Sequence, residues 1–304
     1  MYKKIKITLG VFTAGIMLSG SVALPTQAAG SQSIVFASNR DGNLEIYASE
    51  RDGNNVRRLT NSTNDDKEPA ASPDGKRVVF ASTDDPDDFE EALVLLDMRT
   101  QQQTQLTSSN KHDYRNPVWS PDGTKIAFTS ISTEGPYESC INVMVVQTKQ
   151  LQKVICAGVW LGNPDWSPDG TKLLYSEFYR PTGGKMYSVQ AQTGADKQFI
   201  GNGSAAVFSP KGDQIAFSAY DADYISQIFV AKVDGSMARQ ITTGAEIKTV
   251  ADWAQDGYIT YSGIVLGETP LQVRSIKSDG TGVIALPPKG TSFDLPGNGL
   301  LVNS

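Results

Sequence analysis

The chain has one histidine and two cysteines among its 304 residues, and this scarcity excludes several kinds of active site. A zinc site made of several histidine or cysteine ligands is not available. A serine hydrolase triad would have to use His112, and no Gly-x-Ser-x-Gly motif presents a nucleophile. We therefore predict that the protein is not an enzyme and that it has no cofactor.

Long apolar runs are missing after the N-terminus. Residues 1–29 combine three lysines, an apolar stretch from Ile7 to Leu18 and the small residues Ala28 and Ala29. This pattern predicts a cleaved signal peptide; the alternative, a membrane anchor, needs about 20 apolar residues. We expect export to the periplasm or the medium, no membrane insertion, and one domain over residues 30–304.

Basic residues are also scarce. Removal of the three lysines in 1–29 changes the formal charge from −6 to −9. Such an acidic chain is a poor partner for nucleic acid or an anionic lipid surface. Glycine and proline are plentiful, at 28 and 15 residues, and long helical periodicity is missing. These features indicate an all-β protein.

A repeat of about 45 residues dominates the rest of the chain. The sequence Ser-Pro-Asp-Gly occurs three times and is followed by three degenerate copies. The last glycines of the six copies lie at 75, 123, 170, 212, 257 and 299, so the spacings are 48, 47, 42, 45 and 42. This period is typical of one four-stranded blade of a β-propeller.

Each repeat predicts four strands, named A to D from the centre outward. Strand A precedes the Ser-Pro-Asp-Gly turn, as at 116–120, and the alternating strand B follows it, as at 125–130. Strands C and D form a hairpin whose turn often contains Asp-Gly, and strand D ends in Leu-Thr or Ile-Thr.

Five complete sets of strands begin near 68, 116, 163, 205 and 250. Residues 34–60 supply strands B, C and D only, so we expect their strand A to come from 291–295. This exchange closes a six-bladed β-propeller of four-stranded blades, with first and last blade joined. The tail at 300–304 is not placed by this count and leaves a seven-bladed alternative open.

The segments Phe36-Ala-Ser-Asn-Arg-Asp-Gly-Asn-Leu-Glu-Ile-Tyr47 and Asn163-Pro-Asp-Trp-Ser-Pro-Asp-Gly170 resemble the repeats of the TolB-like β-propeller family. The resemblance covers nearly all of 30–304 and implies a protein-binding propeller of the cell envelope. TolB itself carries an α/β domain before its propeller. Here the first blade strand starts about five residues after the predicted cleavage site, so we expect a stand-alone relative and leave a role in a Tol-Pal system open.

Loop lengths indicate one working face. The B–C loops (83–91, 131–140, 177–184, 219–226) and D–A loops (108–115, 243–249) are long and emerge at the same end of a propeller. Aromatic residues and arginines, which dominate interface energetics, gather there. We predict partner binding by Phe89, Tyr114, Arg115, Tyr137, Trp160, Tyr179, Arg180, Tyr220 and Tyr224. The alternative is that these side chains only cover blade edges.

Residues near the Ser-Pro-Asp-Gly turns have a different expected role. Trp119, Trp166, Phe208 and Trp253 recur one residue before the turn motif, which predicts inter-blade core. Three nearby aspartates are expected to point into the central channel, either as solvated walls or as holders of water or a cation: Asp165, Asp252 and Asp294.

Two further features concern metal and redox chemistry. The acidic run at 84–91 offers carboxylates for Ca²⁺ but lacks the EF-hand pattern, and a solvated loop is the alternative. Cys140 and Cys156 lie equidistant from Thr148, the expected turn between strands C and D of one blade. Antiparallel pairing then brings them face to face, and an oxidising compartment favours a disulfide over two buried thiols.

The sequence therefore predicts a monomeric, exported binding or scaffold module that recognises a protein through its long-loop face, with a role in envelope maintenance or transport. The alternative is a carbohydrate-binding protein, or a glycosidase that uses the channel carboxylates.

Overall fold

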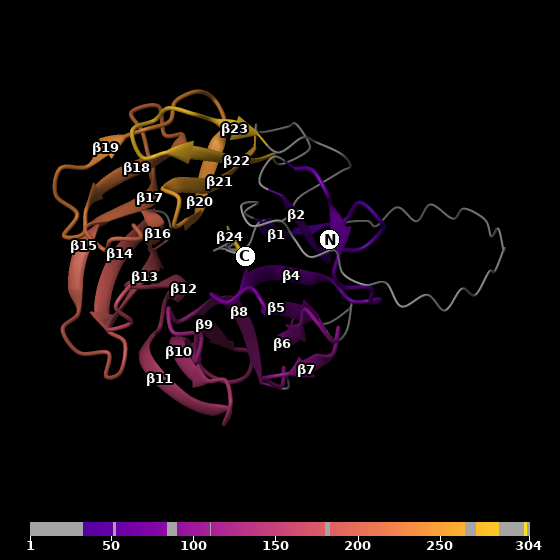
Figure 1. Cartoon of the computed structure of the whole chain (residues 1–304). Helices are drawn as coiled ribbons and strands as arrows, with labels where there is room; N and C mark the ends of the chain where they lie inside the picture. Colours follow the sequence, from indigo (N-terminus) through magenta and orange to yellow (C-terminus); the bar gives the residue numbers. More distant parts are fainter. Residues whose placement is uncertain are drawn as a thin grey trace, which may run out of the picture.

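The protein is a ring of six antiparallel sheets, each of four strands (Figure 1). The computed structural model describes residues 33–50, 53–83, 90–109, 111–179, 183–264, 272–285 and 301–302. One strand of each sheet lies nearest the centre of the ring, and the other three follow outward in chain order. The six-bladed β-propeller predicted from the repeat is confirmed, and the seven-bladed alternative is wrong.

The strands follow the predicted order A to D within each blade. Blades 1 and 2 consist of β24 (Leu301–Val302), β1 (Ser33–Ser38), β2 (Glu45–Glu50) and β3 (Arg57–Arg58), then β4 (Asp66–Ala71), β5 (Arg77–Thr83), β6 (Glu91–Asp97) and β7 (Gln103–Gln105). Blades 3 and 4 consist of β8 (His112–Trp119), β9 (Lys125–Ser132), β10 (Ser139–Val145) and β11 (Gln150–Ala157), then β12 (Trp160–Trp166), β13 (Lys172–Tyr179), β14 (Gly183–Gln190) and β15 (Gln198–Asn202). Blades 5 and 6 consist of β16 (Ser204–Phe208), β17 (Gln214–Tyr220), β18 (Ser226–Lys232) and β19 (Arg239–Gln240), then β20 (Ile247–Trp253), β21 (Tyr258–Ile264), β22 (Gln272–Lys277) and β23 (Ile284–Ala285).

The closing strand is not the one that the repeat predicted. β24 takes the strand A position of blade 1, with Ser33 opposite Val302 and Ile34 opposite Leu301. The expectation that 291–295 fills this position is therefore wrong, and the tail is the missing element. The spacing of the repeat predicts where a strand lies along the chain, but it does not show which strands pair. In the last repeat, the strand that pairs with β1 follows Gly299 instead of preceding the turn motif.

The turn motif is explained by hydrogen bonds of its own residues. In blade 3 the Ser120 hydroxyl donates to Asp122 (2.6 Å) and accepts the backbone N–H of Lys125 (2.9 Å). Gly123 closes the turn in the left-handed region, with φ of 67°. The Ser120 contact is the largest cause of the lowered pKa of Asp122. The same serine–aspartate bond forms at Ser72–Asp74 and Ser167–Asp169.

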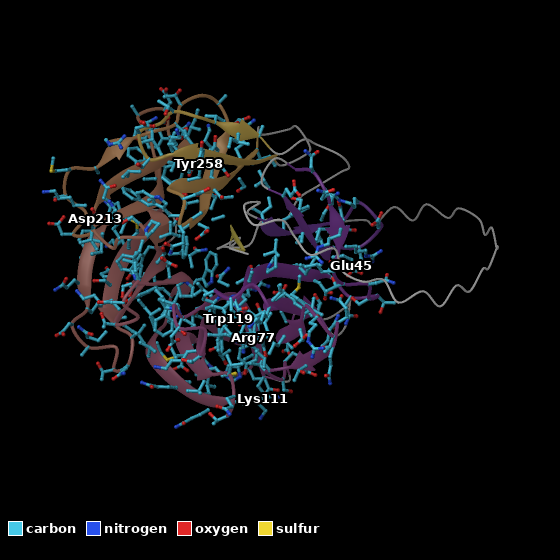
Figure 2. The ribbon with its side chains drawn as sticks, viewed as in Figure 1. Glu45, Arg77, Lys111, Trp119, Asp213 and Tyr258 are labelled. Carbon is cyan, nitrogen blue, oxygen red and sulfur yellow. A yellow bond between two sulfur atoms is a disulfide. The ribbon has the colours of Figure 1, made fainter. Side chains whose placement is uncertain are left out.

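The hydrophobic core consists of six clusters, one at each seam between neighbouring blades. At the seam of blades 2 and 3, Trp119 is 5 % exposed and donates its indole N–H to the carbonyl of Ala70 (3.0 Å). The guanidinium of Arg77 lies 4.5 Å from the Trp119 ring centroid, and Figure 2 shows both side chains. Trp166, Phe208 and Trp253 are buried in the corresponding clusters, so the predicted inter-blade core is confirmed.

The Leu-Thr and Ile-Thr pairs extend the outer edge of blades 1, 2 and 5 beyond strand D. The Thr107 hydroxyl accepts the backbone N–H of Leu93 at 2.8 Å, and Thr60 and Thr242 do the same for Ile46 and Ile228 at 2.9 Å. In each case the donor lies 14 residues earlier in the chain. The threonine side chain thus satisfies a buried N–H group of strand C that would otherwise lack an acceptor.

We expect Thr107→Val to destabilise the protein by about 1–2 kcal/mol, because the buried N–H of Leu93 loses its acceptor while the side-chain volume is kept. Thr104→Val is the matched control, since Thr104 lies on the exposed strand β7. Urea unfolding measures both. Equal losses in the two variants would contradict this role for Thr107.

The two cysteines form the predicted disulfide. Cys140 on β10 lies directly opposite Cys156 on β11, and their sulfur atoms are bonded. The predicted pairing of the two cysteines is therefore confirmed. Next to the turn, Val145 lies opposite Gln150, one residue off the register expected about Thr148, and a bulge between Ile141 and Asn142 brings the cysteines face to face. The disulfide joins the two outer strands of blade 3 near the end of the ring that carries the β9–β10 loop.

Candidate functional site

The B–C loops and the D–A connections emerge at one end of the ring, which we call the long-loop face. Between strands B and C the described loops include 133–138 and 221–225; between strands D and A they include 106–109 and 241–246. The opposite end carries the Ser-Pro-Asp-Gly turns and the C–D hairpins. The antiparallel order of each blade therefore gathers the less regular segments on a single surface.

Exposed aromatic side chains on this face come from three adjacent blades. Tyr137 is 49 % exposed in the β9–β10 loop, and Trp160 is 38 % exposed at the start of β12. Tyr220 is 65 % exposed at the end of β17, and Tyr224 is 86 % exposed in the β17–β18 loop. Among the described residues, the other strongly exposed aromatic is Phe199 on the outermost strand of blade 4. Blades 3 to 5 thus present the exposed tyrosines and tryptophan together.

Trp160 is held in place from two sides. Its ring stacks on Phe178 of the neighbouring strand, with 4.2 Å between centroids. The next residue, Leu161, donates its N–H to the hydroxyl of Ser139 (3.1 Å), which adjoins the disulfide residue Cys140. Packing and hydrogen bonding across the seam of blades 3 and 4 therefore fix the orientation of an exposed indole.

The aromatic surface continues into blade 5 across the start of β14. Phe178 pairs with Gly184, and Tyr179 pairs with Gly183, at the start of β14. The Tyr220 ring lies over this end, 3.7 Å from the position that a Cβ of Gly183 would take. This is an ordinary contact distance, so the Tyr220 ring lies against the start of β14. The surface then runs from Trp160 through Phe178 and Tyr179 to Tyr220.

The other described residues of the predicted set are half-buried. Tyr114 packs edge-on against Phe128, and burial raises its pKa. The hydroxyl of Tyr179 donates to Glu177 at 2.5 Å, and this bond is the main cause that raises its pKa to about 12. Both rings thus contribute to the packing beneath the four exposed aromatic side chains. Phe89 and Arg180 lie outside the described residues.

Buried charges form networks beneath the long-loop face that the sequence analysis did not anticipate. Glu91, 2 % exposed, accepts a bond from Lys67 Nζ at 3.0 Å and lies 3.8 Å from Arg115 Nη2. Arg115 also contacts Asp113 through its Nε at 2.5 Å. Glu91 ends the acidic run considered for Ca²⁺, and residues 84–89 of that run lie outside the described residues.

A second network lies under blade 1. Glu45 is fully buried and is contacted by Arg58 Nη2 at 2.6 Å and by the hydroxyl of Thr60 at 2.5 Å. Figure 2 labels Glu45 within this blade. Asp66, 1 % exposed, lies beside it at the start of β4. One feature of the sequence could have indicated that Glu45 is buried. It occupies the same position of the repeat, before the Ile-Tyr or Ile-Phe of strand C, as the uncharged Gln227 in another blade.

The channel aspartates occupy the innermost strands. Asp165 Oδ2 accepts the backbone N–H of Phe208 in the next blade at 2.7 Å. Burial raises the pKa of Asp165 well above its ordinary value, and the nearby charge of Asp252 adds to the shift. Asp165 therefore ties two blades together. Asp294 lies outside the described residues.

Two other places were considered as sites. Among the described residues, the one group of three metal-ligand side chains is Glu138 with Cys140 and Cys156, whose sulfurs are joined in the disulfide and supply no thiolate. A cavity of about 350 Å³ opens at the other end of the ring, between blades 3 and 4, and its lining includes Trp166. Neither contains a residue predicted to bind a partner.

Comparison with known proteins gives a consistent family resemblance. No family model matches the chain. A TolB homolog of Chlorobaculum tepidum is 51 % identical over 47 residues, which cover 16 % of this chain and 11 % of that protein. The matched segment therefore spans about a tenth of the relative's length. In the part of the chain that the structure describes, no helix is long and apolar enough to span a membrane.

Solved structures share the fold at low sequence identity. TolB from Acinetobacter baumannii superimposes with a TM-score of 0.73 at 16 % identity, covering 89 % of this chain and 67 % of that one. A TolB structure from Agrobacterium tumefaciens gives 0.66 at 18 % identity, covering 89 % and 92 %. An oligogalacturonate lyase in complex with manganese gives 0.53 at 17 % identity, covering 85 % and 74 %, so enzymes also use this fold. The chain therefore has the six-bladed β-propeller fold of the TolB structures, and a segment of its sequence is similar to a TolB homolog.

Proposed function

We propose that this chain is an exported, protein-binding propeller that recognises its partner with the aromatic surface of blades 3 to 5. The observation that carries the proposal is the placement of Tyr137, Trp160, Tyr220 and Tyr224 on one end of three adjacent blades. Large exposed aromatics of this kind supply most of the binding energy of protein interfaces when a partner covers them. The TolB likeness supports an envelope protein as the partner.

Export is supported by the disulfide, because such bonds persist in oxidising compartments. The predicted signal peptide at 1–29 lies outside the described residues. A binding role also accounts for the chemistry of the face better than catalysis does. The buried carboxylates Glu91 and Glu177 are paired with lysines at 3.0 and 2.5 Å, and Asp165 holds a backbone N–H of the next blade.

Affinity capture from envelope extract tests the proposal. One variant combines Tyr137→Ser, Trp160→Ser, Tyr220→Ser and Tyr224→Ser. A control variant changes four exposed apolar residues on the C–D hairpins and outer strands to serine: Leu151, Phe199, Val233 and Met237. We expect the unchanged protein and the control to enrich the same protein, and the aromatic variant to lose it by at least about a hundredfold. Equal capture by both variants, or no enriched protein, would overturn the proposal.

A further inference from the structure

The loop between β17 and β18 is an ordered, protruding turn with the sequence Tyr220-Asp-Ala-Asp-Tyr224. The N–H of Asp221 donates to the carbonyl of Ile225 at 3.0 Å, and the N–H of Tyr224 donates to the carbonyl of Asp221 at 3.2 Å. The Asp221 carboxylate in turn accepts the N–H groups of Asp223 and Ile225, at 2.9 and 3.0 Å. The loop thus holds its two tyrosines in a defined arrangement.

Tyr224 occupies a position that suits the fold poorly. Its φ is 59°, in the left-handed region where glycine and asparagine are favoured and a bulky side chain is strained. The side chain is 86 % exposed, so packing within the described structure does not offset this strain. Met237 in a C–D hairpin has a similar backbone, so the feature that favours a contact with another molecule is the exposed tyrosine ring beside Tyr220 rather than the strain alone.

The charge of the loop indicates the chemistry of that molecule. Asp221 and Asp223 lie between the tyrosines, and neither forms an ion pair within 4.0 Å among the described residues. The cation that interacts with Asp221 is Lys248, which is 3 % exposed and donates to the backbone carbonyls of Thr243 and Glu246. The loop therefore presents the Asp223 carboxylate and two tyrosine rings outward, while the half-buried Asp221 carboxylate holds the loop backbone and adds negative charge beside them.

Resting on the proposed function, we propose that this loop binds an extended, arginine-bearing segment of the partner protein. An arginine guanidinium pairs with a carboxylate and stacks on a tyrosine face, so one side chain engages both groups that the loop presents. From Tyr220 the same segment reaches Phe178 and Trp160 along the aromatic surface over Gly183. The negative charge of the chain attracts such a segment during encounter.

The affinity of the protein for a labelled peptide of alternating arginine and serine tests this inference. A peptide of alternating glutamate and serine serves for comparison, and fluorescence anisotropy at about 0.15 M salt measures both affinities. The loop variant carries Asp221→Asn and Asp223→Asn. The control carries Asp234→Asn and Asp279→Asn, which remove the same charge from exposed C–D hairpins at the other end and keep acceptors for Ser236 and Thr281. We expect the loop variant to lose about tenfold in affinity for the arginine peptide and the control about twofold or less. Equal losses, or equal binding of both peptides, would overturn the proposal.

Tyr224→Asn supplies an independent readout. Asparagine tolerates the left-handed backbone, so the urea midpoint of this variant should rise while its affinity for the arginine peptide falls about tenfold. A variant that keeps its affinity would overturn the proposal. Capture of the natural partner distinguishes failure of this inference from failure of the proposed function. If the aromatic variant loses the partner but the loop variant binds it fully, the protein-binding function stands and the preference for arginine is wrong.

Discussion

Gly235→Ala is expected to destabilise the protein by about 4 kcal/mol, because this glycine is where blade 5 touches blade 4. A Cβ at Gly235 would lie 1.9 Å from the carbonyl oxygen of Ile200 on the outer strand of blade 4. One blade earlier, a Cβ added at Gly194 would likewise lie 2.0 Å from the carbonyl oxygen of Val154. The glycine turns of blades 4 and 5 thus bring their C–D hairpins against the preceding blade as well as reversing the chain.

Gly257→Ala is the matched control for that prediction. Gly257 has a φ of 85°, against 81° at Gly235, but nothing lies within 4 Å of its added Cβ. Both variants carry the strain of a left-handed alanine, which costs about 1 kcal/mol, and only Gly235→Ala must separate two blades. Unfolding in urea should therefore show a loss at Gly257 that is about a quarter of the loss at Gly235. Equal losses would mean that blade contact does not restrict this turn.

Asp66→Asn is expected to make the protein more stable at pH 8 and to leave it nearly unchanged at pH 4. Burial is the main cause that raises the pKa of Asp66 to about 6, and the charge of Glu45 raises it further. The hydroxyl of Ser82, which donates to Asp66 at 2.6 Å, opposes the shift. Asp66 Oδ2 is buried and has no hydrogen-bond partner among the described residues.

The sign of the effect follows from proton binding. The folded protein binds the proton of Asp66 more tightly than the unfolded chain, so this stabilisation is complete below about pH 4 and is lost as the pH rises through about 6. A shift of about two pKa units corresponds to about 3 kcal/mol. Urea unfolding of both proteins at the two pH values measures it. A stability difference between variant and parent that does not change with pH would contradict the raised pKa.

The blades could be predicted from sequence because their signals are local. The Ser-Pro-Asp-Gly turn, the alternating strand B and the Asp-Gly hairpins each depend on a few adjacent residues, and the spacing of copies then determines the number of blades. The pairing of Cys140 with Cys156 was predictable to within one residue, since a tight turn sets the register of a hairpin, and a bulge between Ile141 and Asn142 supplies the remaining shift.

The candidate site depends on contacts between blades, which local patterns do not contain. Tyr114 and Tyr220 look alike in the sequence, yet one packs against Phe128 and the other lies exposed over Gly183. The buried carboxylates Glu45 and Glu91 resemble surface acids, because their partners Arg58 and Lys67 are supplied by the fold. The closing strand was misplaced because it pairs β1 with a segment from the opposite end of the chain.

Site-specific photocross-linking in living cells tests the central claim most directly. Tyr224 on the long-loop face and Phe199 on the outer strand of blade 4 are both exposed aromatics, and each is replaced in turn by p-benzoylphenylalanine. If the aromatic surface of blades 3 to 5 is the binding face, position 224 should form a cross-linked product with one protein, and position 199 should not. The same product from both positions, or a product from position 199 alone, would contradict this account.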